Sequence, residues 1–141
     1  MKLFKFFPLL VLLTGCGTAD QEIYQQPLVL DYPEESQIVW EDVLKQEDEL
    51  YYVYFYSLTC GYCANLKAQM LEYNQTTTNV LYFCNVTDGF MYKENVNSVI
   101  GCNEISEFGI VGIPSLIEIT KNTVSNYFLG ISAITVFIEN K

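Results

Sequence analysis

The sequence predicts an α/β domain built on a mixed sheet with helices on both faces. Segments rich in aromatic and β-branched residues alternate with amphipathic segments, and turn-forming residues separate them. From the strongest strand onward the expected order is β-α-β-α-β-β-α, without an internal repeat. The length of 141 residues suits a single domain, and the 50% hydrophobic content is enough for a packed core.

The strongest strand is expected at residues 51–57, which are almost all aromatic or apolar. An unbroken run of this kind is typical of a strand covered on both faces. Its tyrosines predict strand core, although a binding surface is an alternative: Tyr51, Tyr52, Tyr54 and Tyr56. Before it, residues 37–40 predict a short edge strand and residues 41–46 a short helix.

A helix is expected at residues 60–75, because Cys63, Leu66 and Met70 follow helical spacing on one face. Residues 80–86 predict a second core strand, and residues 87–101 a polar loop with room for one helical turn. A short helix over residues 102–108 should end at Gly109.

The C-terminal part predicts a hairpin followed by a helix. Residues 115–120 and 123–129 are β-rich, and Lys121-Asn122 between them is a two-residue turn signal. After a turn at Gly130, Ser132 is expected to cap the last helix. In that helix, residues 134, 137 and 138 share an apolar face.

The composition excludes several classes of function. With 7 Lys plus Arg against 17 Asp plus Glu, the net charge of −10 repels phosphate backbones, so no nucleic-acid partner is expected. The chain has no histidine. Ser–His–Asp and Cys–His nucleophile pairs therefore cannot form, nor can the common histidine-bearing zinc and copper sites.

The first fifteen residues predict a secretory signal. Lys2 and Lys5 give a positive start, and the apolar run at residues 6–13 is shorter than the roughly 20 residues needed to span a bilayer. The string LTGC at residues 13–16 resembles the bacterial lipoprotein signal, which implies cleavage before Cys16 and a lipid thioether on its sulfur. An ordinary secreted protein with an incidental Cys16 is the alternative.

Residues 16–35 are expected to form a lipid-anchored tether before the folded domain at residues 36–141. The segment at residues 17–33 is polar and holds two prolines, which favours a spacer between membrane and domain. An extra strand at residues 28–32 is compatible with this interpretation. Acyl chains on Cys16 would hold the protein to the membrane by hydrocarbon burial.

The chemistry is expected at Cys60-Gly61-Tyr62-Cys63, which follows the strongest strand and opens a helix. Two intervening residues let the sulfurs meet across the first helical turn. Unpaired N–H groups at a helix start favour an anion, so the pKa of Cys60 should be lowered. Cys60 would attack a substrate disulfide and the shielded Cys63 would resolve the mixed disulfide. A structural disulfide, or half of a zinc site completed by Cys84 and Cys102, are the alternatives.

Two motifs resemble the thioredoxin family over residues 37–141. Residues 55–63, FYSLTCGYC, are similar to its active-site strand and turn, and residues 108–115, FGIVGIPS, to its cis-proline loop. Residues 127–130 and the last helix resemble its C-terminal end. The motifs occur in the right order, about 50 residues apart, which is far more specific than either alone. The resemblance implies a thioredoxin-like fold.

The resemblance also implies a role for each matching residue. Cys60 is the nucleophile, Cys63 the resolving thiol and Pro114 a cis-proline packed against the active-site disulfide. Ile113 would offer backbone hydrogen bonds to an extended substrate, with Tyr62 beside it between the cysteines. No cofactor beyond the redox-active Cys60–Cys63 disulfide is expected.

The chain departs from the family pattern at three positions. Tyr54 replaces a buried Asp that assists proton transfer from the second cysteine, and Phe83 replaces its Lys partner. Tyr56 replaces a Trp. These changes weaken the expectation of efficient general disulfide reduction. The pair Gly61-Tyr62 resembles that of reducing or isomerising relatives more than that of strong oxidants.

Cys84 and Cys102 remain as an even pair in an oxidising compartment. Their disulfide would clamp the loop between them, whereas two free thiols, with Cys84 buried as a small apolar residue, are the alternative.

The sequence as a whole predicts a membrane-anchored thiol–disulfide oxidoreductase on the extracytoplasmic face of a bacterial cell membrane. Its partners would be exported proteins with thiols or disulfides, a membrane electron donor or acceptor, and the lipid bilayer. The alternative is a non-catalytic thioredoxin-like lipoprotein that binds a partner or assists export.

Overall fold

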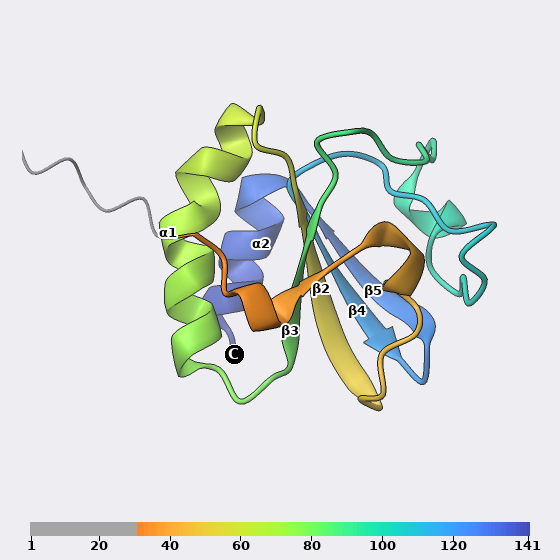
Figure 1. The fold of residues 1–141 in the computed structure, drawn as a ribbon, viewed down its shortest axis with the longest axis horizontal. Coiled ribbons are helices and arrows are strands. Elements are labelled where there is room, and N and C mark those ends of the chain that lie inside the picture. The colour runs from red at the N-terminus through yellow and green to blue at the C-terminus, as the bar shows by residue number, and fades with distance from the viewer. Residues whose placement is uncertain (1–30) are drawn as a thin grey trace, which may run out of the picture. The chain divides into compact units, whose positions relative to one another are not determined.

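A computed structural model describes residues 31–141, and the expected signal peptide, the Cys16 anchor and most of the tether lie outside these residues. Within residues 31–141 the strands form one sheet in the order β1-β3-β2-β4-β5 (Figure 1). The strands β1, β2 and β3 run parallel, and β4 and β5 are antiparallel to their neighbours. Their bounds are β1 (Gln37–Ile38), β2 (Leu50–Tyr56), β3 (Leu81–Asn85), β4 (Ser115–Thr120) and β5 (Thr123–Leu129).

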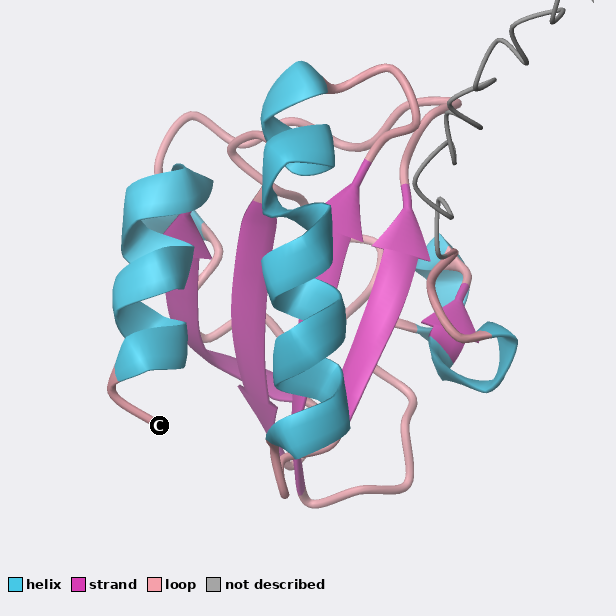
Figure 2. Cartoon of the chain, turned by 90° about the vertical axis from the view of Figure 1, so that its left-hand side faces the viewer, coloured by secondary structure: helices cyan, strands magenta, loops and turns pink. Residues whose placement is uncertain are grey.

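One face of the sheet is covered by the two α-helices of this part of the chain, α1 (Gly61–Thr76) and α2 (Gly130–Glu139). Figure 2 shows them side by side in front of the strands. The expected apolar face of α1 is confirmed, since Cys63, Leu66 and Met70 are all buried. They pack with Ile134 and Phe137 of α2 against the sheet.

The opposite face is covered by loops and by short 3-10 helices. Trp40 in η2 (Trp40–Asp42) and Val96 in η3 (Val96–Ser98) pack on a core that includes Val43, Phe108 and Ile110. The expected mixed sheet of an α/β fold is therefore confirmed. Both α-helices lie on one face, and the only helices on the other face of the described residues are these three-residue 3-10 turns. The expected helix at residues 41–46 is reduced to η2 and the turn that follows it.

The expected helix at residues 102–108 does not form. Backbone bonds pair its start with β5, because Gly101 N donates to the Val124 carbonyl at 2.8 Å and Val124 N to the Cys102 carbonyl at 2.9 Å. Only one turn follows, closed by Phe108 N donating to the Glu104 carbonyl at 3.0 Å. A start that is hydrogen-bonded to a strand leaves too few residues to propagate a helix.

The hairpin signal at Lys121-Asn122 is confirmed. Both residues adopt positive φ angles, 50° and 59°, as a two-residue turn between right-twisted strands requires. The expected cap at Ser132 is wrong, because Gly130 at φ 80° turns the chain directly from β5 into α2. The helix therefore begins two residues before Ser132, and Leu129 at its N-cap makes no side-chain cap bond.

The strand β2 is central in the sheet and buried on both sides, as expected. The tyrosines of β2 are core residues, with exposed fractions of 6% or less at Tyr51, Tyr52, Tyr54 and Tyr56. Tyr32 joins this core from before the expected domain start at residue 36. Its ring stacks on Phe83 with centroids 4.4 Å apart. The last residues of the expected tether are therefore part of the packed unit.

No helix in residues 31–141 has the length and apolar character that crossing a membrane requires.

Gly109 is required by a close backbone approach and not by a helix end. It is buried beside the bridge that pairs Tyr92 with Ile110, where Ile110 N donates to the Met91 carbonyl at 2.9 Å. A Cβ on Gly109 would lie 2.7 Å from that carbonyl oxygen.

We therefore predict that Gly109→Ala lowers the free energy of unfolding by about 1–3 kcal/mol, the usual cost of forcing extra atoms into a packed core. Urea unfolding followed by circular dichroism measures this. Gly61→Ala is the matched control, because nothing lies within 4 Å of a Cβ there. Equal effects of the two substitutions would contradict the proposed steric cause.

Candidate active site

The residues expected to act in catalysis meet at one edge of the sheet. The register pairs Tyr56 with Asn85, Phe55 with Ser115, and Ser115 with Leu129. Consequently the loops after β2 and β3, the approach to β4 and the start of α2 lie together. A bond from Gly130 N to the Pro114 carbonyl, at 2.9 Å, links two of these segments.

Cys60 and Cys63 form a disulfide across the first turn of α1, with their Cα atoms 5.2 Å apart. Cys60 is the N-cap residue, and its sulfur accepts a bond from Cys63 N at 3.1 Å. Cys60 is partly exposed, whereas Cys63 is only 2% exposed. The expected pairing and the difference in burial are thus both present.

This arrangement favours exchange at the first sulfur. Peptide N–H groups at a helix start stabilise negative charge, so an anionic Cys60 sulfur would be favoured when the bond opens. A partner sulfur can reach Cys60 but not the buried Cys63. On either side of Cys60, Leu58 and Tyr62 are 74% and 69% exposed, which gives this end of the molecule an accessible apolar rim.

The loop before β4 contains the expected cis-proline. The Ile113–Pro114 peptide bond is cis, Pro114 is buried, and Ile113 is half-buried between the two halves of the core. Pro114 directly precedes Ser115, which pairs with Phe55 of β2. The loop therefore lies at the same edge of the sheet as the cysteines.

Sequence reasoning missed the bonds that hold this loop. The hydroxyl of Tyr127, on β5, lies 2.8 Å from the Ser115 hydroxyl and accepts a hydrogen bond from Val111 N at 2.9 Å. The Ser115 hydroxyl also donates to the Gly112 carbonyl at 2.5 Å. Burial raises the pKa of Tyr127, while these polar contacts lower it. Polar residues at inward positions of two predicted strands were the available signal.

Two of the three departures from the family pattern, Tyr54 and Phe83, contact each other. The rings of Tyr54 and Phe83 lie 6.1 Å apart on the side of the sheet that α1 covers. The buried Tyr54 hydroxyl has no hydrogen-bond partner in the described part of the chain, and burial raises the pKa of Tyr54 to about 12. Tyr54 is therefore neutral near pH 7 and cannot accept a proton as a carboxylate would.

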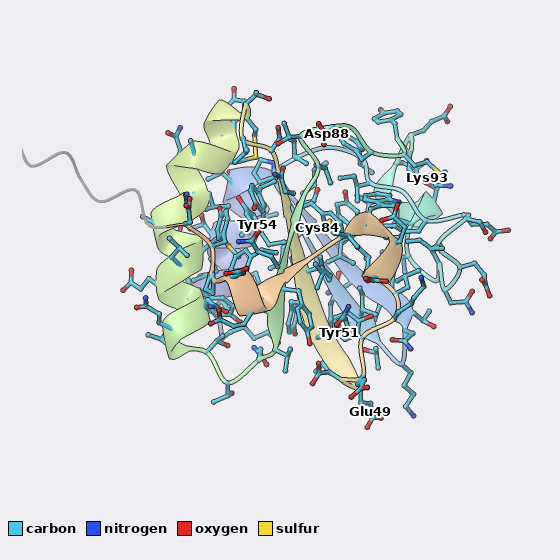
Figure 3. All side chains as sticks on the ribbon, in the orientation of Figure 1. Glu49, Tyr51, Tyr54, Cys84, Asp88 and Lys93 are labelled. Carbon is cyan, nitrogen blue, oxygen red and sulfur yellow. A yellow bond between two sulfur atoms is a disulfide. The ribbon has the colours of Figure 1, made fainter. Side chains whose placement is uncertain are left out.

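The expected Cys84–Cys102 disulfide is wrong, since both cysteines are free. Cys84 lies on β3, whereas the backbone of Cys102 is bonded to Val124 of β5, and two strands separate β3 from β5. Three strand spacings amount to about 14 Å, twice the limit for a disulfide. Figure 3 shows Cys84 and Tyr54 on opposite sides of the sheet.

Within residues 31–141 no three Cys, Asp or Glu side chains gather as ligands for a metal ion. Cys84 lies on the face opposite to Cys63, so these cysteines cannot complete a shared four-cysteine zinc site. Cys16 lies outside the described residues.

Comparison with solved structures identifies the architecture. One similar chain comes from a study of thiol resolution in a yeast mitochondrial 1-Cys peroxiredoxin through the glutathione and thioredoxin systems. It has a TM-score of 0.50 at 13% identity, over 75% of this chain and 94% of that one. The fold is thioredoxin-like.

Two thioredoxins are also similar to this thioredoxin-like chain. The oxidised thioredoxin of Plasmodium falciparum has 20% identity and a TM-score of 0.48, over 72% of this chain and 88% of that one. A variant thioredoxin of Halobacterium salinarum has 15% identity and a TM-score of 0.49, with coverages of 78% and 94%. No family model and no curated protein matches the sequence.

The buried thiol predicts a loss of stability in alkali. Burial, and next the Glu41 charge, raise the pKa of Cys84 from 9.0 to about 12. Between these values the folded state keeps a proton that the unfolded state loses. The free energy of unfolding should therefore fall above pH 9, by about 1.4 kcal/mol per pH unit from this group. Urea unfolding of the oxidised protein at pH 8, 9 and 10 measures the slope.

Cys84→Ala is the control for this slope. Its overall stability will be lower because of the cavity, but its decline between pH 9 and 10 should be shallower than that of the wild type. Identical slopes would show that Cys84 is not the group responsible. The buried tyrosines, among them Tyr51 and Tyr54 with pKa values raised from 10.0 to about 12, begin to contribute as the pH approaches 10. They contribute equally in both proteins, so the difference between the two slopes reports Cys84.

Proposed function

We propose that the protein is a membrane-anchored, extracytoplasmic thiol–disulfide oxidoreductase that reduces or isomerises disulfides of exported proteins. The observation that carries this proposal is the Cys60–Cys63 disulfide at the start of α1, with one accessible and one buried sulfur. In a thioredoxin-like fold this pair lies where a polypeptide disulfide can reach Cys60.

In the reducing direction, the Cys60 thiolate attacks one sulfur of a substrate disulfide. A mixed disulfide forms and the first substrate thiolate leaves. The Cys63 thiolate then attacks the Cys60 sulfur and releases the second substrate thiolate. The substrate gains two electrons and takes up two protons, and Cys60–Cys63 becomes oxidised. A membrane electron donor must return two electrons and two protons to reset it.

Isomerisation needs only the first of these steps. The released substrate thiolate attacks another disulfide of the same substrate, and a substrate thiolate finally displaces Cys60 without net oxidation. The absence of a proton acceptor at Tyr54 supports this use, because the step that depends on deprotonating Cys63 is then not assisted. No other cofactor is proposed.

Substrate contact is proposed along the exposed rim beside Cys60. The backbone of Ile113 would bond an extended substrate segment next to the disulfide, with Tyr62 packing on its side chains. Ile113 lies two residues before Ser115, which pairs with Phe55 at this edge of the sheet. Main-chain bonding would allow unrelated sequences to bind, as a general exchanger of exported proteins requires.

Loss of the nucleophile gives the direct test of activity. Cys60→Ser should lower insulin reduction, and reactivation of scrambled ribonuclease, by at least about a hundredfold, because a hydroxyl cannot replace the thiolate. Cys63→Ser should instead accumulate a mixed disulfide on Cys60, visible as a mass increase under non-reducing conditions.

The competing proposal is a non-catalytic thioredoxin-like binding or export-accessory lipoprotein. Its test uses the double variant Cys60→Ser, Cys63→Ser. If the wild type shows neither activity and the double variant still binds a cellular partner, the result would support the binding module and contradict the enzyme.

Anchoring is proposed from the LTGC string at residues 13–16 and the apolar run before it. In bacteria expressing the full chain, labelled palmitate should enter the wild type and not Cys16→Ala, and the variant should leave the membrane fraction. Label that persists in Cys16→Ala would contradict the lipoprotein assignment. Cys102→Ala is the matched control and should remain labelled.

A further inference from the structure

A chain of polar side chains joins the loop before Cys60 to the loop after β3. It comprises Ser57 and Thr59 on the first loop, Asn85 at the end of β3, and Thr87 on the second loop. The two loops meet because Tyr56 and Asn85 are the last paired residues of β2 and β3. In Figure 3, Asp88, which directly follows Thr87, lies near the end of the molecule where α1 begins.

The Thr87 hydroxyl is the junction of this cluster. It donates to Asn85 Oδ1 at 2.5 Å, and it accepts from Leu58 N at 2.9 Å and from the Ser57 hydroxyl at 3.4 Å. A hydroxyl has one donor and two acceptor positions, so its full capacity is used. Asn85 Oδ1 also accepts from Thr87 N at 2.9 Å, which fixes Thr87 relative to the strand.

The other end of the cluster reaches the residues directly before Cys60. Ser57 Oγ accepts from Thr59 N at 3.3 Å and lies 3.0 Å from Thr59 Oγ1. The Ser57 carbonyl accepts from Cys60 N at 3.2 Å. Three residues, beyond the last strand pair, thus separate β2 from Cys60, and the Thr87 hydroxyl bonds two of them.

The position of Cys60 matters more here than in a site with a neighbouring cation. The chain has no histidine, so none can stabilise a thiolate at Cys60. The bond from Cys63 N to the Cys60 sulfur, at 3.1 Å, is the stabilising contact that the structure provides. Such a bond weakens steeply with distance and misalignment, so the loop before Cys60 must be held in place.

We propose that Thr87, oriented by Asn85, is a positioning residue for Cys60. Its hydroxyl holds residues 57–59 so that the Cys60 sulfur stays at the start of α1, in reach of the Cys63 N–H group. The segment Asn85-Val86-Thr87 thereby acquires a role at the redox site. This inference rests on the proposed use of Cys60 as nucleophile.

The test measures the ionisation of Cys60 directly and needs no substrate. In a Cys63→Ser background, the rate of iodoacetamide labelling of the Cys60 peptide is followed by mass spectrometry from pH 4 to pH 10. Thr87→Val removes the hydroxyl at nearly constant shape. It should move the midpoint of the rate profile to higher pH and slow labelling at pH 6 by at least about threefold.

Three comparisons complete the experiment. Thr87→Ser, which restores the hydroxyl, should return the profile to that of the parent. Thr120→Val should leave it unchanged, because its hydroxyl lies at the opposite end of β4, 3.2 Å from Ser125. Circular dichroism checks that each variant is folded, and Asn85→Ala should shift the profile in the same direction as Thr87→Val.

An unchanged profile in folded Thr87→Val would overturn the proposal. Equal shifts in Thr87→Ser and Thr87→Val would also overturn it, because the hydroxyl would then not be the cause. The outcome is separate from the proposed function. A wild type that neither reduces insulin nor reactivates scrambled ribonuclease would contradict the proposed enzyme activity. The labelling profile reports the position of Cys60 whether or not that activity is found.

Discussion

The site depends on one constraint, the pairing of β2 on both edges while both its faces are buried. β3 and β4 pair with β2 along most of its length, so β2 cannot shift its register without exposing aromatic side chains. Asn85 and Ser115 are therefore held opposite Tyr56 and Phe55. Four chain segments distant in sequence consequently meet at one place, and Cys60 follows Tyr56 after three intervening residues.

The same aromatic packing limits the chemistry beneath the cysteines. Tyr54 and Phe83 contribute ring contacts, together with Tyr32 from the start of the packed unit. The cost is an unpartnered buried hydroxyl on Tyr54, which ordinarily disfavours folding by about 1–3 kcal/mol. A neutral, buried tyrosine cannot remove the proton of Cys63, so that proton must leave to solvent or to the departing substrate thiolate. The proposed isomerisation does not require Cys63 in every cycle and is therefore compatible with this environment.

The four cysteines of the described residues divide by environment. Cys60 and Cys63 are placed by a helix start, where the backbone favours a sulfur anion. Cys84 faces the opposite core, where burial keeps the thiol protonated. Cys102 is held beside the edge strand β5 by the bond from Val124 N to its carbonyl. Their distances and burial, and not their even number, decide which of them pair.

The sequence by itself determined the features that depend on neighbouring residues. The CxxC spacing at a helix start, the apolar face of α1, the Lys121-Asn122 turn and the buried strand β2 were all predictable, because local periodicity and turn chemistry encode them. Only the tertiary structure decided the separation of Cys84 from Cys102 and the bonding of residues 101–102 to β5, because both depend on strand order. It also brought Thr87 to Ser57 and Tyr127 to Ser115, contacts between distant residues that no local pattern records.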